Sequence, residues 1–265
     1  MPRERLRRQI GLVVAGWDLL RLELRSLTGN RGLILVLVEL AWFASASIWY
    51  FANDRPLEIE WFYNGAVVLP GIIPAIALGM AAVMGERDTR QLEVSFSSPG
   101  GRYLLWSFRI VAITAALFAS CVVMSMLTWL VIDQQVVHRL VAVFWSGMRL
   151  PVHAADFPVW EACLHATVPL ALVAVITILF SVLFRGAAVA GLLTVALCGI
   201  SRPFIAGILG RRCDLFFNPF VPPDDLLDPA VWFRMIVFNR ALLIVLTALA
   251  VALTLMLLQR RERLV

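Results

Sequence analysis

The sequence contains no lysine, so the basic residues among its 265 positions are all arginines. This absence excludes a P-loop, whose lysine contacts the terminal phosphates of a bound nucleotide. It also excludes Schiff-base chemistry, which needs a lysine amine. We therefore expect that the chain hydrolyses no nucleotide, binds no cofactor of its own and is not itself an enzyme.

Charged residues of any kind are scarce. They make up 15% of the chain, whereas 61% of the residues are hydrophobic and the mean hydropathy is +0.85. A typical soluble domain has about 25% charged residues, and a soluble fold of this size could not hide so much apolar surface, so lipid must solvate part of it. The net charge of +5 is better explained by arginines that flank membrane spans than by nucleic-acid binding.

Cysteine and histidine are few and scattered, with four and three residues respectively. They lack the spacing of metal ligands, so no metal site is expected. Cys121 and Cys198 fall in apolar runs and are expected to be small core residues. Cys163 and Cys213 could both lie on the outer side and pair, although the sequence does not set their distance. His165 and the other two histidines are interpreted as residues of the outer surface.

The sequence is rich in long apolar segments, each of which meets the need for roughly 20 residues to cross a bilayer. The segments are continuous and lack the alternation of barrel strands, so they predict an all-α integral membrane protein, with a six-helix transmembrane domain over residues 32–265. Pro70 and Pro74 should kink the second span. The predicted spans are 32–51, 62–85, 103–132, 159–184, 187–209 and 237–258.

Residues 1–31 are predicted to form an amphipathic helix on the cytoplasmic surface of the membrane. Apolar residues such as Trp17 recur there every three or four positions, and arginines occupy another sector. Arginine placement puts both termini in the cytoplasm of a multi-pass protein of the cell inner (plasma) membrane. Arg211 and Arg212 fall on the wrong side for this rule.

The third outer segment, about 210–236, is unusual because prolines alternate with aromatic residues over its length. Prolines interrupt helices, and aromatic side chains favour the membrane interface. We expect short, broken helices that re-enter the outer leaflet and form a hairpin before the last span.

The most informative stretch is the cytoplasmic loop 85–99, after the second span. Asp88 followed by Gln91 resembles a capping box. Leu92 and Phe96 lie one helical turn apart, and Pro99 ends the pattern. Such a short charged helix with an apolar face suits docking into a groove on a soluble partner. The alternative is a solvated loop that has no partner.

This loop resembles the corresponding loop of permeases of the type-2 ABC transporter family, and the layout of most of the chain is similar to theirs. Asp88 departs from the family pattern, which usually has a glycine just before the threonine. The residues that carry the resemblance are Gly85, Glu86, Arg87, Thr89, Leu92, Glu93 and Pro99.

The resemblance implies a transmembrane subunit of an ATP-driven exporter. ATP and Mg would be bound by a separate ATPase, present in two copies, which grips the loop as a coupling helix. A second permease subunit, identical or homologous, would pair with the first, and a lipidic or amphipathic substrate would pass between them. The coupling contacts would be Glu86, Arg87, Thr89, Leu92, Glu93 and Phe96.

Glu39 is a carboxylic acid in the first span. At membrane depth it costs about 2.5–3.5 kcal/mol, so it should face a pore, a polar neighbour or a partner. We expect Glu39, with Pro70 and Pro74, to border the translocation path or the dimer interface. Alternatively, Glu39 is a structural residue, protonated or paired with Arg109 or Arg202.

Arg240, near the start of the sixth span, is expected to extend its side chain to the headgroups.

Two other classes of function compete with a transporter subunit. One is a channel or scaffold subunit without energy coupling, against which the coupling-like loop argues. The other is an intramembrane enzyme, which needs clustered carboxylates, a Ser–His pair or metal ligands at membrane depth. The isolated Glu39 offers no such cluster.

Overall fold

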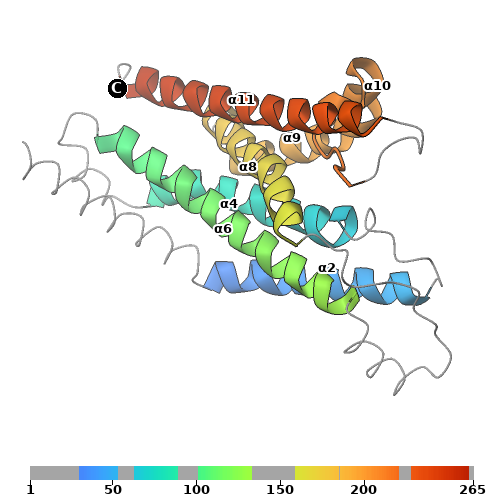
Figure 1. Cartoon of the computed structure of the whole chain (residues 1–265). Helices are drawn as coiled ribbons and strands as arrows, with labels where there is room; N and C mark the ends of the chain where they lie inside the picture. The colour runs from blue at the N-terminus through green and yellow to red at the C-terminus, as the bar shows by residue number, and fades with distance from the viewer. Residues whose placement is uncertain are drawn as a thin grey trace, which may run out of the picture.

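The computed structural model of the chain describes residues 30–52, 63–88, 101–132, 159–184, 186–220 and 228–262 (Figure 1). All regular structure among these residues is helical, which confirms the all-α prediction for this part of the chain. The predicted amphipathic helix over 1–31 lies almost wholly outside it. The elements are α2 (Asn30–Ala52), η1 (Tyr63–Val68), α4 (Leu69–Asp88), α6 (Gly101–Ile132), α8 (Val159–Phe184), α9 (Ala187–Ile200), η3 (Ser201–Ile205), α10 (Ala206–Leu209), η4 (Arg211–Cys213) and α11 (Pro229–Glu262).

Four helical stretches are long and apolar enough to cross a membrane. They are Tyr63–Ala82, Trp106–Leu130, Val159–Phe184 and Ala230–Leu258. The apolar parts described in α2 and α9 are shorter, Ile34–Ser45 and Ala187–Ile200. The chain is therefore a helical protein with at least four helices that fit a bilayer by length and composition.

Helix α8 is the centre of the bundle. It packs against α4, α6, α9 and α11, and in Figure 1 it passes between α11 above and α4 and α6 below. Its side chains are buried along most of its length, including Ala166, Leu170 and Ile178. The core of the molecule therefore follows this helix.

Small residues bring α4 and α8 close together. Gly71, Ala75 and Gly79 recur every four residues on α4, and all three are buried. A Cβ atom on Gly79 would lie 2.7 Å from the carbonyl oxygen of Ala174 on α8. Helices in membranes associate through such small residues because close backbone approach maximises van der Waals contact.

The two prolines predicted to kink the second span lie where the helix changes its geometry. The π-helix η1 ends just before Pro70, and Pro74 lies inside α4 without ending it. In an i→i+5 ladder the carbonyl of Gly65 would face residue 70, but proline has no N–H to donate. The indole Nε1 of Trp42 on α2 donates to that carbonyl instead, at 3.1 Å. A proline in the second span thus opens a hydrogen-bond site that the first helix fills.

The last helix begins earlier than predicted, at Pro229 rather than near 237. Asp228 caps it, since its Oδ1 accepts the N–H of Ala230 at 2.9 Å. Proline suits the first position of a helix, where no N–H is needed. The sequence prediction was wrong here because it treated every proline of the outer segment as a helix breaker.

Candidate functional site

The predicted coupling residues fall at the edge of the described structure. Glu86 and Arg87 lie in the last turn of α4, and nothing is described of their side chains. Helix α4 continues through Asp88, where the sequence predicted that a new helix starts. The other predicted coupling residues, Thr89, Leu92, Glu93 and Phe96, lie outside the described residues.

A polar cluster that the sequence did not reveal surrounds Arg240 of α11. The guanidinium donates from Nε to His165 Nδ1 (3.0 Å) and from one amino group to Asn239 Oδ1 (2.9 Å). Its other amino group donates to the carbonyl oxygen of Phe217 (3.0 Å) and to the hydroxyl of Tyr63 (3.4 Å). Arg240 is only 8% exposed, so the prediction that its side chain reaches the headgroups is wrong. Local hydrogen-bond partners hold the arginine inside the bundle.

These bonds fix the protonation pattern of His165. Because Nδ1 of the half-buried ring accepts a proton from Arg240, the neutral ring carries its own proton on Nε2. The four groups that accept from Arg240 are all neutral, so its charge is stabilised by dipoles rather than by a carboxylate. The interpretation of His165 as a surface residue is therefore wrong.

Asn239, the neighbour of Arg240, binds the segment that precedes α11. Its Nδ2 donates to the carbonyl oxygens of Arg212 (3.0 Å) and Asp214 (2.8 Å). Together with the bond from Arg240 to Phe217, this secures three carbonyls between residues 212 and 217. Two adjacent side chains of α11 thus hold the backbone of a segment that has little regular structure of its own.

A second set of bonds ties the same segment to η3. The hydroxyl of Ser201 donates to Asp214 Oδ1 at 3.3 Å and accepts the N–H of Leu215 at 3.1 Å. Asp214 also accepts the N–H of Phe216. The π-helix that carries Ser201 contains Pro203, which cannot join a helical ladder as a donor. Both π-helices, η1 and η3, therefore contribute a polar side chain to the cluster.

Aromatic rings cover the cluster. The ring of Phe220 meets those of Tyr63 and His165 edge to face, with centroids 5.1 and 6.0 Å apart. Phe217 stacks at a tilt on Trp232, whose Nε1 donates to the carbonyl of Pro219 at 3.2 Å. The expected irregular segment before the last helix is thus present as a short ordered structure over 210–220. Whether it re-enters a leaflet stays a prediction.

Glu39 is buried by its own chain, at 3% exposure. The hydroxyl of Ser120 on α6 lies 2.7 and 2.8 Å from its two carboxyl oxygens. Arg109 lies eleven residues from Ser120, about 16 Å along the helix, and donates to the carbonyl of Ala82. The polar neighbour of Glu39 is therefore a serine of α6, and its role in a path or dimer interface stays a prediction.

The cysteines are free thiols, which the structure places at different depths. Cys121 and Cys163 are buried, and the Cys163 thiol lies 3.4 Å from the carbonyl of Cys121. Cys163 and Cys213 are both free, so the pairing that the sequence left open does not occur. Cys163 belongs to α8, where it packs against α6.

Among the described residues, His, Cys, Asp and Glu side chains form no group of three that could hold a metal ion. What the arrangement does offer is a buried, positively charged polar centre that joins η1, α8, η3 and α11. Comparison with protein-family models, with curated proteins and with solved structures finds no match to this chain.

Proposed function

We propose that this chain is the membrane-spanning permease subunit of an ATP-driven ABC exporter, with ATP hydrolysed by a separate partner. The observation that carries the proposal is the continuity of α4. The apolar residues of α4 continue to Met84, and the helix runs on to Asp88, about 6 Å further. Glu86 and Arg87, where the resemblance to coupling loops begins, therefore extend from a membrane-crossing helix as part of one rigid rod.

The arrangement of the helices supports six crossings. The six helical segments, starting with α2 and ending with α11, alternate in direction (Figure 1). The end of α10 and the start of α11 lie at one end of the bundle, and the C-terminal end of α11 lies at the other. This alternation would leave loop 89–100 and the C-terminus on one side of the membrane, as a shared cytoplasmic face requires.

The mechanism would be a population shift. A partner ATPase that closes on ATP and Mg would pull on the end of α4 and bias a pair of permease subunits between inward-facing and outward-facing states. Such a bias requires that the ATPase bind the two states with different affinity. The small-residue contact of α4 with α8 would pass the movement to the centre of the bundle.

The ordered segment 210–220 would close the outer end of the path. Asn239 and Arg240 hold it against α11, and Ser201 holds it against η3. If this segment opens in every transport cycle, the hydrogen bonds that hold it must break together. Most of these bonds come from two adjacent side chains of α11, Asn239 and Arg240. The strongly apolar spans favour a lipidic or amphipathic substrate.

Co-purification from the native membrane tests the proposal. The chain should bring down an ATPase with two copies per complex, and the chain alone should hydrolyse no ATP. The triple variant Glu86→Arg, Arg87→Glu, Leu92→Ala should lose most of the ATPase, because both the charge pattern and the apolar contact of the loop are removed.

The matched control exchanges two exposed charges at the other end of the bundle, Glu161→Arg with Arg234→Glu. It should retain the ATPase as the wild type does. If the triple variant binds its ATPase and exports at the normal rate, the coupling role of this loop is refuted.

A further inference from the structure

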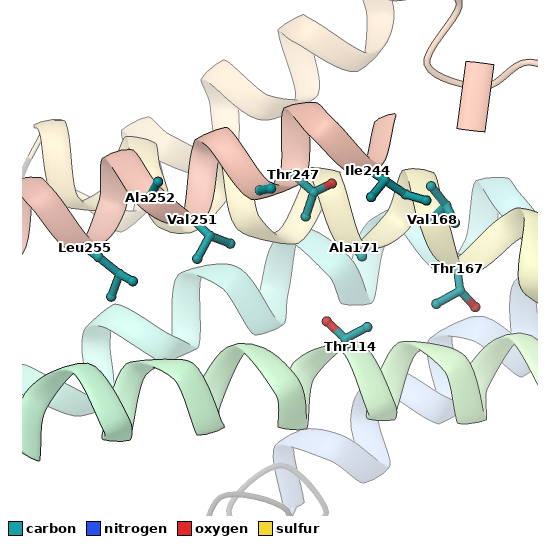
Figure 2. A pocket seen from close by; sticks show the side chains of 10 residues that line it. Thr114, Thr167, Val168, Ala171, Ile244, Thr247, Val251, Ala252 and Leu255 are labelled. Carbon is teal, nitrogen blue, oxygen red and sulfur yellow. The ribbon is translucent and has the colours of Figure 1, made fainter. Parts of the chain in front are cut away.

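A groove runs between α6, α8 and α11. Its volume is about 540 Å³, which falls in the range of sites that hold small ligands. Figure 2 shows α11 above and α6 below, with side chains of both turned into the space between them and α8 behind. Lining residues include Thr114 of α6, Thr167 and Ala171 of α8, and Ile244, Thr247 and Leu255 of α11.

The lining of the groove presents an apolar surface to a ligand, although it contains three threonines. Each threonine hydroxyl donates to the carbonyl four residues earlier in its own helix: Thr114 to Ile110, Thr167 to Cys163 and Thr247 to Leu243. The donors are therefore already used, and the remaining lining residues are aliphatic. A dry cavity of this kind favours a hydrocarbon over a polar ligand.

The length of the groove fits one leaflet of a bilayer. Its lining on α11 extends from Ile244 to Leu255, which is about 16 Å of helix. The hydrocarbon core of a bilayer is about 30 Å thick, so one leaflet accounts for about 15 Å. Leu255 lies close to Leu258, the end of the apolar window of α11, so the groove occupies the half nearer the C-terminal end.

The groove is open on the surface of the helix bundle, beside exposed apolar side chains. Both α6 and α11 pack on α8, and much of the α11 surface beside the groove is exposed, as at Leu249 and Leu253. A chain could therefore enter sideways between α6 and α11.

The sequence carries two arginines on α11 beyond the end of the groove. Helix α11 continues past Leu255 and carries Arg260 and Arg261 in its last turns, about 8 Å further along the axis. Arginines that follow a membrane helix attract anionic lipid headgroups. The apolar groove and the arginines beyond it match the two parts of an anionic phospholipid.

We infer that the groove between α6, α8 and α11 binds one acyl chain of an anionic phospholipid, drawn from the leaflet at the C-terminal end of α11. Arg260 and Arg261 attract its headgroup. The site depends only on helices that cross the membrane, so it is independent of the coupling to an ATPase.

Native mass spectrometry of the full chain in detergent tests this site, with phosphatidylglycerol and phosphatidylcholine of identical chains as probes. The wild type should retain one phosphatidylglycerol in preference to phosphatidylcholine. Ala248→Trp should fill the groove and weaken retention at least tenfold, since Ala248 lines it. Ala196→Trp, on an exposed face of α9 that does not line the groove, is the matched control and should bind as the wild type does.

The double variant Arg260→Gln, Arg261→Gln separates headgroup from chain. It should keep a bound lipid but lose about tenfold of the preference for phosphatidylglycerol. If Ala248→Trp perturbs folding, as judged by its helicity and elution volume, Ala252→Phe provides a smaller filler at another lining position. Equal retention by the wild type and a folded groove-filling variant would overturn the site, and equal retention of the two lipids by the wild type would overturn the anionic preference.

Discussion

Helices α8 and α11 are equally apolar but stand in opposite environments. Their mean hydropathies are 2.6 and 2.8, yet 67% of the α8 window and only 22% of the α11 window are buried within the chain. Neither hydropathy nor length distinguishes them. In a bilayer, lipid and protein neighbours are similarly apolar. An apolar helix face therefore indicates that the helix lies in the membrane, but it does not indicate whether lipid or protein covers that face.

Most of the surface of α11 is therefore not covered by the rest of the chain. Large side chains along it are exposed, among them Ile244, Leu249, Leu253 and Met256. The groove beside α8 takes up one part of its surface. In a membrane, lipid or a partner protein must cover the rest. Stability measurements on the isolated chain and on the complex can separate these cases.

The largest expected difference between the two helices is in the stability lost when one leucine of each helix is truncated to alanine. Leu170 of α8 is 0% exposed and Leu249 of α11 is 55% exposed. Leu170→Ala should lower the free energy of unfolding by about 3–5 kcal/mol through lost packing. Leu249→Ala should change it by less than about 0.5 kcal/mol. Thermal unfolding of the chain in detergent measures both, and equal losses would show that α11 is packed in the isolated chain.

A somewhat smaller effect is expected where α11 is anchored to its neighbours. Arg240→Met removes four hydrogen bonds and should cost about 2–3 kcal/mol, because buried acceptors lose their donor. Labelling of the partly exposed Cys213 with a membrane-impermeant maleimide should accelerate as the segment it belongs to loosens. Arg234→Met, at an exposed position of the same helix, is the control and should leave both measurements unchanged. Unchanged Cys213 labelling in Arg240→Met would show that this arginine does not hold the segment.

The smallest expected effects on stability come from replacing one glycine of α4 and one glycine of α9 by alanine. The two replacements should change stability in opposite directions. Gly79→Ala would place a Cβ atom 2.7 Å from the Ala174 carbonyl and should destabilise the chain by about 1–2 kcal/mol. Gly199→Ala meets no atom within 4 Å and should stabilise it by about 0.5–1 kcal/mol through helix propensity. Unfolding midpoints of the two variants give the comparison. Stabilisation by both would show that α4 and α8 are less closely packed than described.

Much of the helical layout could be predicted because apolar runs and arginines delimit it. The expected spans 32–51, 103–132 and 159–184 correspond to α2, α6 and α8 within two residues at each end. The fifth ends at Leu209 as predicted, although it changes from α-helix to π-helix at Ser201. The helices α4 and α11 end three and four residues later than the predicted spans 62–85 and 237–258. The start of α11 was misplaced most, because proline can begin a helix as well as break one.

The polar cluster could not be predicted because its members are far apart in the sequence and each has an ordinary explanation alone. Tyr63, His165 and Arg240 are separated by about a hundred and by 75 residues, and only the packing of η1, α8 and α11 brings them together. One feature could have raised suspicion: Asn239 and Arg240 are adjacent polar residues in an otherwise apolar helix. Two such residues at one depth seldom lie against lipid.

The π-helical turn of η1 makes the chain sensitive to the insertion or deletion of a single residue in that segment. A change of one residue rotates everything before it by about 100° relative to everything after it. Deleting one residue between Asn64 and Val68 would leave a perfectly apolar helix of nearly the same length, and hydropathy would register nothing. Gly71 and Gly79 would keep their places against α8, but Tyr63 would swing away from Arg240 and Trp42 would lose the carbonyl of Gly65. The number of residues in segment 64–68 thus sets the rotation of Tyr63 and Gly65 relative to α4.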